Sequence, residues 1–129
     1  HSSARRTKMN QAQVFINAPL KASDMIDTDV VSPQGDSLGE VREVVIDPNT
    51  GRVAYAVVSF GGFLSVGEKL FAIPFKALKY NWDENEYVLD VSKEQLEEAP
   101  GFDEDNWPTM SEQWNRDVHK YYELPPYWE

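Results

Sequence analysis

Cysteine is absent from this chain of 129 residues. Disulfides, thiol nucleophiles and thiolate metal sites are therefore excluded together, and a reducing compartment suits the sequence. Long apolar runs are missing too: the longest candidate, residues 53–60, has the length of a strand and not the roughly 20 residues of a membrane-spanning helix. Only one histidine, His119, follows the first residue, and a single histidine makes no metal site without partner ligands.

Positive charge is scarce in the second part of the chain. Residues 1–82 carry 9 Lys/Arg and 8 Asp/Glu, whereas residues 83–129 carry 3 Lys/Arg and 14 Asp/Glu, so the net charge of -10 comes from there. Such a surface repels phosphate backbones and anionic lipid headgroups. We expect no direct nucleic-acid binding and no membrane span. Because the first residues lack the apolar core of a signal peptide, we expect a cytoplasmic protein.

Short strands separated by turn residues dominate the region from Val30 to Val91. Five or six such strands within about sixty residues, with no helix long enough for a parallel crossover, predict a mainly β fold. The expected architecture is a small, partly open antiparallel β-barrel with a short helical, aromatic-rich C-terminal extension. Glycine and proline mark the predicted structural turns and breaks at Gly35, Gly39, Gly51, Gly61, Gly62, Gly67 and Pro74. The predicted core contains Val41, Val45, Val53, Tyr55, Val57, Phe71, Ile73 and Leu89.

The periodicity becomes helical after the last strand. Ser92, followed by Gln95 three places later, predicts a helix start that ends before a Pro-Gly pair. A second helix is predicted within residues 110–122, where apolar residues recur at spacings of four and three. Seven of the 16 aromatic residues lie in residues 102–129, a load that a solvated tail does not carry. This segment is expected to pack on its own barrel or on a second copy.

The stretch GGFLSVGEKL, residues 61–70, comes close to a phosphate-binding loop. Gly62 and Gly67 have the required interval, but the lysine arrives one place late and leucine replaces the hydroxyl that would bind magnesium. The stretch also leads into a β pattern, whereas a phosphate-binding loop opens a helix. A glycine-containing β connection is favoured, with Phe63 and Leu64 exposed at its tip for contact with a partner.

Other catalytic or metal-binding interpretations find little support. The calcium-like DPNTGRVAYAVV has its glycine one place early and lacks the closing glutamate, so a hairpin turn fits better. The carboxylates in residues 83–86 and 103–105 are typical of a solvated surface, because paired catalytic carboxylates need one member in an apolar pocket. His119 flanks the apolar stripe, where capping or an interface contact is expected. A hydrolase centred on His119 is the third alternative; we expect no enzyme, cofactor or metal.

Short motifs in residues 24–102 follow the order seen in a known family. This segment resembles the PRC-barrel domain, the β-barrel module of the photosynthetic reaction-centre H subunit, which also ends a ribosome maturation factor. The ending from Trp107 to Trp128 is similar to that of stand-alone bacterial members. The motifs are Gly35, Leu38-Gly39-Glu40-Val41, Val45-Ile46-Asp47, Gly51-Arg52-Val53, Gly61-Gly62-Phe63, Gly67-Glu68-Lys69-Leu70-Phe71-Ala72-Ile73-Pro74 and Ala99-Pro100-Gly101-Phe102.

The resemblance implies a docking module without catalytic residues. It divides the chain into a tag remnant and N-terminal arm (1–23), the barrel (24–102) and a C-terminal helix with a Pro- and aromatic-rich tail (103–129). We expect a non-enzymatic adaptor that forms a homodimer and binds an unidentified protein. The alternatives are a barrel that binds a small ligand or one associated with the ribosome and RNA processing. The predicted interface residues are Phe63, Leu64, Trp107, Met110, Trp114, Val118, Tyr121, Tyr122, Tyr127 and Trp128.

Overall fold

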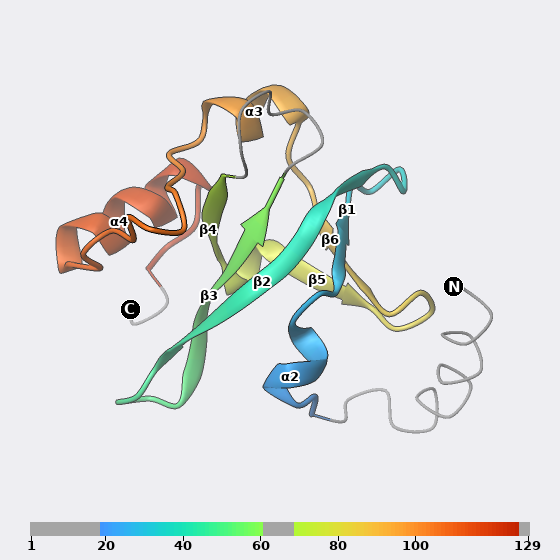
Figure 1. Ribbon diagram of the computed structural model, residues 1–129, viewed down its shortest axis with the longest axis horizontal. Helices are drawn as coiled ribbons and strands as arrows, with labels where there is room; N and C mark the ends of the chain where they lie inside the picture. Colours follow the sequence, from blue (N-terminus) through green and yellow to red (C-terminus); the bar gives the residue numbers. More distant parts are fainter. Residues whose placement is uncertain (1–18, 61–68, 127–129) are drawn as a thin grey trace.

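The computed structural model describes residues 19–60 and 69–126, and within them six strands form one curled sheet (Figure 1). The strand order is β4-β3-β2-β1-β6-β5. The strands are β1 (Asp29–Val31), β2 (Ser37–Asp47), β3 (Arg52–Ser59), β4 (Leu70–Pro74), β5 (Leu78–Asn81) and β6 (Glu86–Leu89). The helices are α2 (Ala22–Met25), the 3₁₀ turn η3 (Phe75–Ala77), α3 (Lys93–Glu98) and α4 (Glu112–Tyr121). The prediction of a mainly β, partly open barrel with a helical C-terminal extension is confirmed.

One strand pair differs from the antiparallel expectation. β1 and β6 run parallel, with Val30 opposite Tyr87 and Val31 opposite Val88, while the other paired strands are antiparallel. Parallel neighbours need a long crossover, for which a helix is the usual solution. Here the connection from β1 to β6 consists of strands β2 to β5. Because the sheet curls, β6 comes to lie beside β1. None of the described helices is both long and apolar enough to cross a membrane.

The main core lies on the concave side of the sheet. It includes Val41, Phe71, Ile73 and Leu89, each at most 2% exposed. Val45 and Val53, which were predicted to be buried, are only half-buried. Val45 lies beyond the residues of β2 that pair with β1, and Val53 lies beyond the residues of β3 that pair with β4. The β2–β3 hairpin is the long arm at the lower left of Figure 1.

The glycines serve two different purposes. Gly35 and Gly51, where turns were predicted, have φ angles of 92° and 75°, in the left-handed region that glycine adopts without steric cost. The predicted turn at Gly39 is wrong, because Gly39 lies inside β2. A Cβ atom there would lie 1.8 Å from the backbone oxygen of Ser59, so the close approach of β3 requires glycine. Pro74 ends the edge strand β4, as expected of a break, whereas Gly61, Gly62 and Gly67 lie outside the described residues.

Candidate functional site

Helix α4 begins at the position where its sequence supplies a cap. Ser111 accepts a hydrogen bond from the Trp114 amide at 3.1 Å, which satisfies one of the free N–H groups of the first turn. Glu112 lies in the first turn and Lys120 lies in the last, so the charges of both ends suit the helix dipole. The helix forms within the predicted range of residues 110–122.

The apolar stripe of α4 packs on the sheet of its own chain. Val118 is 5% exposed and forms a cluster with Ala54 and Tyr55 of β3 and Ala72 of β4. The Trp114 ring meets the Tyr55 ring edge-on, with 5.2 Å between their centroids. Of the two arrangements left open by the sequence, the structure shows the intramolecular one. Strand β3 is consequently covered on both faces, which explains its nearly uninterrupted apolar sequence.

A buried polar cluster links α4 to the sheet at Tyr55, Asn115 and His119. The Tyr55 hydroxyl donates to the Asn115 side-chain oxygen and lies 3.3 Å from His119 Nδ1. His119 is 2% exposed, and its Nδ1 lies 2.8 Å from the Asn115 carbonyl oxygen. A carbonyl only accepts hydrogen bonds, so Nδ1 carries the proton and donates it. These contacts hold α4 against the sheet.

The main feature of this cluster was not predicted from the sequence. His119 was expected beside the stripe, as a cap or interface contact, and Asn115 was not singled out. The spacing of four residues between Asn115 and His119 was the available signal, since it puts both side chains on one helix face. Which strand tyrosine completes the cluster could not be read from that spacing, because Tyr55 is 60 residues from Asn115.

A hollow of about 450 Å³ opens beside His119. Its described lining contains no serine, aspartate or glutamate that could complete a nucleophile–base pair with the histidine. The two charged groups there, Arg52 and Lys76, are both basic. The described lining consists of Arg52, Val53, Ala54, Phe75, Lys76 and His119.

The connection between α3 and α4 carries an exposed aromatic residue among carboxylates. Phe102 exchanges two backbone hydrogen bonds of 2.9 Å with Leu70, which fixes the connection to the edge strand β4. The Trp107 ring lies 5.0 Å from the Phe102 ring, yet Trp107 remains 41% exposed. Residues 103–105, Asp-Glu-Asp, are all exposed beside it. We call Phe102, residues 103–105 and Trp107 together the Trp107 surface.

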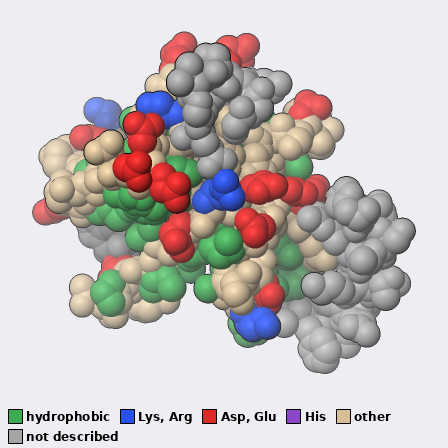
Figure 2. All heavy atoms as spheres, viewed as in Figure 1, with side chains coloured by type: hydrophobic (Ala, Val, Ile, Leu, Met, Phe, Trp, Pro, Cys, Tyr) green, Lys and Arg blue, Asp and Glu red, His purple; other side chains and the backbone are tan. Residues whose placement is uncertain are grey.

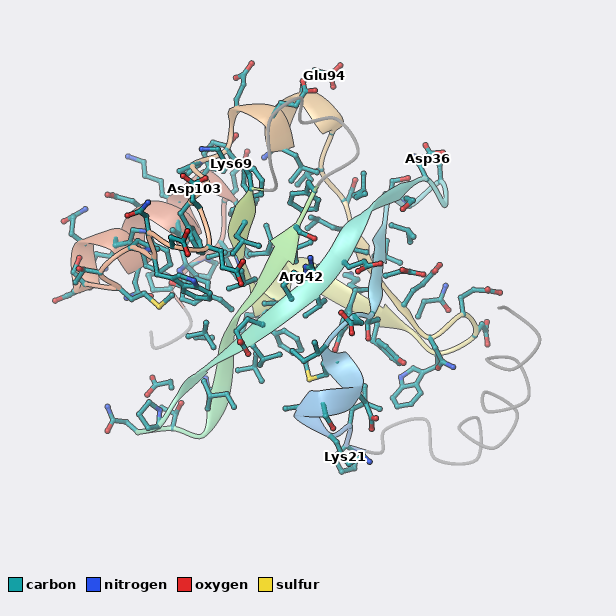
Figure 3. All side chains as sticks on the ribbon, viewed as in Figure 1. Lys21, Asp36, Arg42, Lys69, Glu94 and Asp103 are labelled. Carbon is teal, nitrogen blue, oxygen red and sulfur yellow. The ribbon has the colours of Figure 1, made fainter. Side chains whose placement is uncertain are left out.

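The charge around the Trp107 surface is mainly negative, and Lys69 lies close to it. Lys69 Nζ lies 3.9 Å from an Asp103 carboxylate oxygen, and both side chains are about half exposed. Figure 3 labels this pair between β4 and α4. Figure 2 shows carboxylates gathered around exposed hydrophobic side chains on the α4 side of the molecule. The surface therefore combines an aromatic contact with an acidic surround.

The remaining predicted interface residues take structural positions where they are described. Tyr121 donates its hydroxyl to the Gln95 carbonyl oxygen at 2.5 Å and so connects α4 to α3. Tyr122 packs against Tyr121, with ring centroids 5.1 Å apart, and burial raises the pKa of its hydroxyl. Met110 is half-buried, and its carbonyl accepts a hydrogen bond from the Asn115 side chain. The other members, Phe63, Leu64, Tyr127 and Trp128, lie outside the described residues.

Comparisons with known proteins show what this chain is similar to. A family model described as "PRC-barrel domain" matches residues 20–96. An uncharacterised protein of Deinococcus radiodurans is 31% identical over 64 residues, which are 50% of this chain and 22% of that protein. A solved structure from Pseudomonas aeruginosa, titled as the 16S ribosomal RNA processing protein RimM, aligns with a TM-score of 0.38 and 14% identity, over 61% of this chain and 48% of that one. The chain thus spans about a fifth of the curated relative and about half of the solved one.

Proposed function

Because this chain belongs to the PRC-barrel domain family, we propose that it is a non-enzymatic interaction module that binds a basic protein through the Trp107 surface. The observation that carries the proposal is Trp107 itself, an indole that is 41% exposed although it rests on Phe102. Tryptophan is among the residues that contribute most to protein interfaces. An indole already held by a neighbouring ring loses little conformational freedom on binding.

Charge defines the kind of partner. The carboxylates of residues 103–105 are exposed beside Trp107 and would steer a positively charged surface toward it. The same charges oppose binding to a nucleic-acid backbone. Association with the ribosome was one alternative raised from the sequence, and a basic ribosomal protein would be a partner of this kind. Association with the ribosome would then run through protein and not through RNA.

Replacement of Trp107 by alanine is expected to weaken partner capture strongly. A photo-crosslinking group placed at Glu104, in cells of the source organism, should label basic proteins. Trp107→Ala should reduce the yield of labelled partner at least about tenfold, because loss of an interface tryptophan costs about 2 kcal/mol or more of binding free energy. Mass spectrometry of the labelled products measures this. Ile46→Ala is the matched control, because Ile46 is 51% exposed on the β2–β3 hairpin, away from this surface. Equal labelling by the parent protein, Trp107→Ala and Ile46→Ala would contradict the proposal, as would capture of acidic proteins only.

The homodimer expected from the sequence stays a prediction. Since the α4 stripe packs on its own sheet, two copies would either exchange α4 between chains or pair through other residues. Pairing through the Trp107 surface is opposed by the like charges of residues 103–105. Light scattering over a tenfold range of concentration measures the mass directly. A mass near twice the 14.8 kDa of one chain is expected, and a single-chain mass throughout would rule the dimer out.

A further inference from the structure

A separate cavity of about 260 Å³ opens on the concave side of the sheet. Three of its lining residues, Met25, Leu78 and Tyr87, also belong to the main core. It lies where α2, η3, β5 and β6 meet, and Figure 1 shows α2 beside β1 and below β6. No charged side chain occurs in its described lining, which consists of Leu20, Met25, Val53, Phe75, Leu78, Tyr80, Trp82 and Tyr87.

Tyr87 brings a hydroxyl group to this mainly apolar lining. Its side chain is 3% exposed, and its ring lies 5.0 Å from the Tyr80 ring and 6.0 Å from the Phe75 ring. Tyr80 donates its hydroxyl to the Asn85 side-chain oxygen at 3.2 Å. The Tyr87 hydroxyl, in contrast, forms no hydrogen bond within residues 19–60 and 69–126.

The Tyr87 oxygen is not fully enclosed. No fully enclosed side-chain oxygen or nitrogen in the described part of the chain lacks a hydrogen-bond partner, so this one touches accessible space. Tyr87 is one of the residues that line the 260 Å³ cavity. A ligand that covers this hydroxyl would remove it from solvent, and an acceptor atom on the ligand would offset the cost of that desolvation.

The protonation state of Tyr87 shows that its hydroxyl can donate a hydrogen bond to a ligand. Burial, with a smaller contribution from Tyr80, raises the pKa of the Tyr87 hydroxyl from 10.0 to about 12. The hydroxyl is therefore protonated at neutral pH and acts as a donor. A ligand atom that accepts a hydrogen bond can therefore pair with the Tyr87 hydroxyl. A charged ligand is disfavoured because the described lining offers no opposite charge to compensate its desolvation.

We propose that this cavity binds a small neutral aromatic molecule that accepts one hydrogen bond from the Tyr87 hydroxyl. The size follows from comparison with a cavity of about 150 Å³ in another protein, which holds one benzene molecule. A cavity of about 260 Å³ accommodates a two-ring molecule. The surrounding Phe75, Tyr80 and Trp82 rings provide the edge and face contacts that aromatic ligands prefer. This site is independent of the Trp107 surface and would add a ligand to an interaction module.

The test compares quinoline and naphthalene, two bicyclic molecules of nearly equal shape. Quinoline is neutral at neutral pH and carries one acceptor nitrogen, whereas naphthalene carries none. Titration of the full chain, followed by NMR, should show saturable shifts of the Met25 and Leu78 methyl signals with quinoline. Naphthalene should bind about fivefold more weakly, the usual effect of one missing hydrogen bond. This comparison needs no variant and so does not depend on the folding of a mutant.

Two variants then assign the contact. Tyr87→Phe removes only the hydroxyl and should weaken quinoline binding about fivefold, while naphthalene binding changes less than about twofold. The control Tyr121→Phe removes a hydroxyl that lies outside the cavity and bonds Gln95, and it should change neither affinity. Absence of saturable shifts with quinoline would overturn the proposal, as would shifts confined to other residues. Equal quinoline affinity of the parent protein and Tyr87→Phe would overturn it too.

Discussion

Gly39→Ala is expected to lower the free energy of unfolding by at least about 3 kcal/mol, a large part of the roughly 5–15 kcal/mol that stabilises a typical domain. The added methyl group would stand 1.8 Å from the Ser59 backbone oxygen and 3.0 Å from the Phe60 ring. A flexible side chain could move away, but a backbone oxygen in the neighbouring strand cannot do so alone. Relief requires β2 and β3 to separate where Glu40 pairs with Ser59.

Gly51→Ala is the matched control for this prediction. Gly51 has a φ of 75°, and a Cβ atom there would meet nothing within 4 Å. Its cost is the left-handed backbone alone, about 1–2 kcal/mol. Urea unfolding followed by circular dichroism measures both variants. If Gly39→Ala proved no more destabilising than Gly51→Ala, the close packing of β2 on β3 would not be the reason for glycine at position 39.

Val118→Asp is expected to detach helix α4 from the sheet. Val118 is 5% exposed, and its cluster with Ala54, Tyr55 and Ala72 offers a carboxylate no cation. Leaving an unpaired charge buried costs about 3–5 kcal/mol, so the helix will separate before the charge is buried. The main core on the concave side does not include Val118 and should persist. The α4 amides should then lose about 100-fold in hydrogen-exchange protection, and the β2 amides much less.

Lys120→Asp introduces the same residue at an exposed position of the same helix. It should cost only about 0.5–1 kcal/mol, through the unfavourable charge near the helix C-terminus. Hydrogen exchange read by mass spectrometry distinguishes the two variants. Equal protection of α4 in Val118→Asp and Lys120→Asp would mean that the stripe does not hold the helix. Truncation after Gly101 is a less specific test, because it also removes the backbone pairing of Phe102 with Leu70.

Attachment of α4 also bears on the proposed interaction surface. Trp107 precedes this helix, and its ring rests on Phe102 at the edge of β4. The connection that carries Trp107 is held at one end by Phe102 and at the other by α4. We therefore expect Val118→Asp to weaken partner capture as well, whereas ligand binding at Tyr87 should be unaffected. Partner capture at the Trp107 surface and ligand binding at Tyr87 can thus be tested independently.

Features that depend on a few neighbouring residues could be predicted from the sequence. The β-branched and aromatic runs identified the strands, because side-chain packing on a pleated surface favours those residues. Gly35 and Gly51 identified turns, since glycine adopts positive φ without steric cost. Ser92 identified the start of α3, where its hydroxyl accepts a hydrogen bond from the Gln95 amide at 3.0 Å. Each of these interactions spans no more than a few positions.

The functional features were decided by contacts between residues far apart in the chain. The spacing of apolar residues within 110–122 predicted a helix with an apolar stripe, but it did not indicate which surface would cover that stripe. His119 became a buried residue only because Tyr55, on a distant strand, lies under α4. Trp107 could not be told from the other C-terminal aromatics until the packing left it exposed.

The sequence by itself determined the class of fold, the local turns and caps, and the acidic character of the C-terminal part. Only the tertiary structure decided that β1 and β6 run parallel, that Gly39 serves a close strand contact, and that Tyr87 faces a cavity. The physical reason is the range of the forces involved. Backbone sterics and capping act within one turn or strand, whereas burial depends on which surfaces the curl of the sheet brings together.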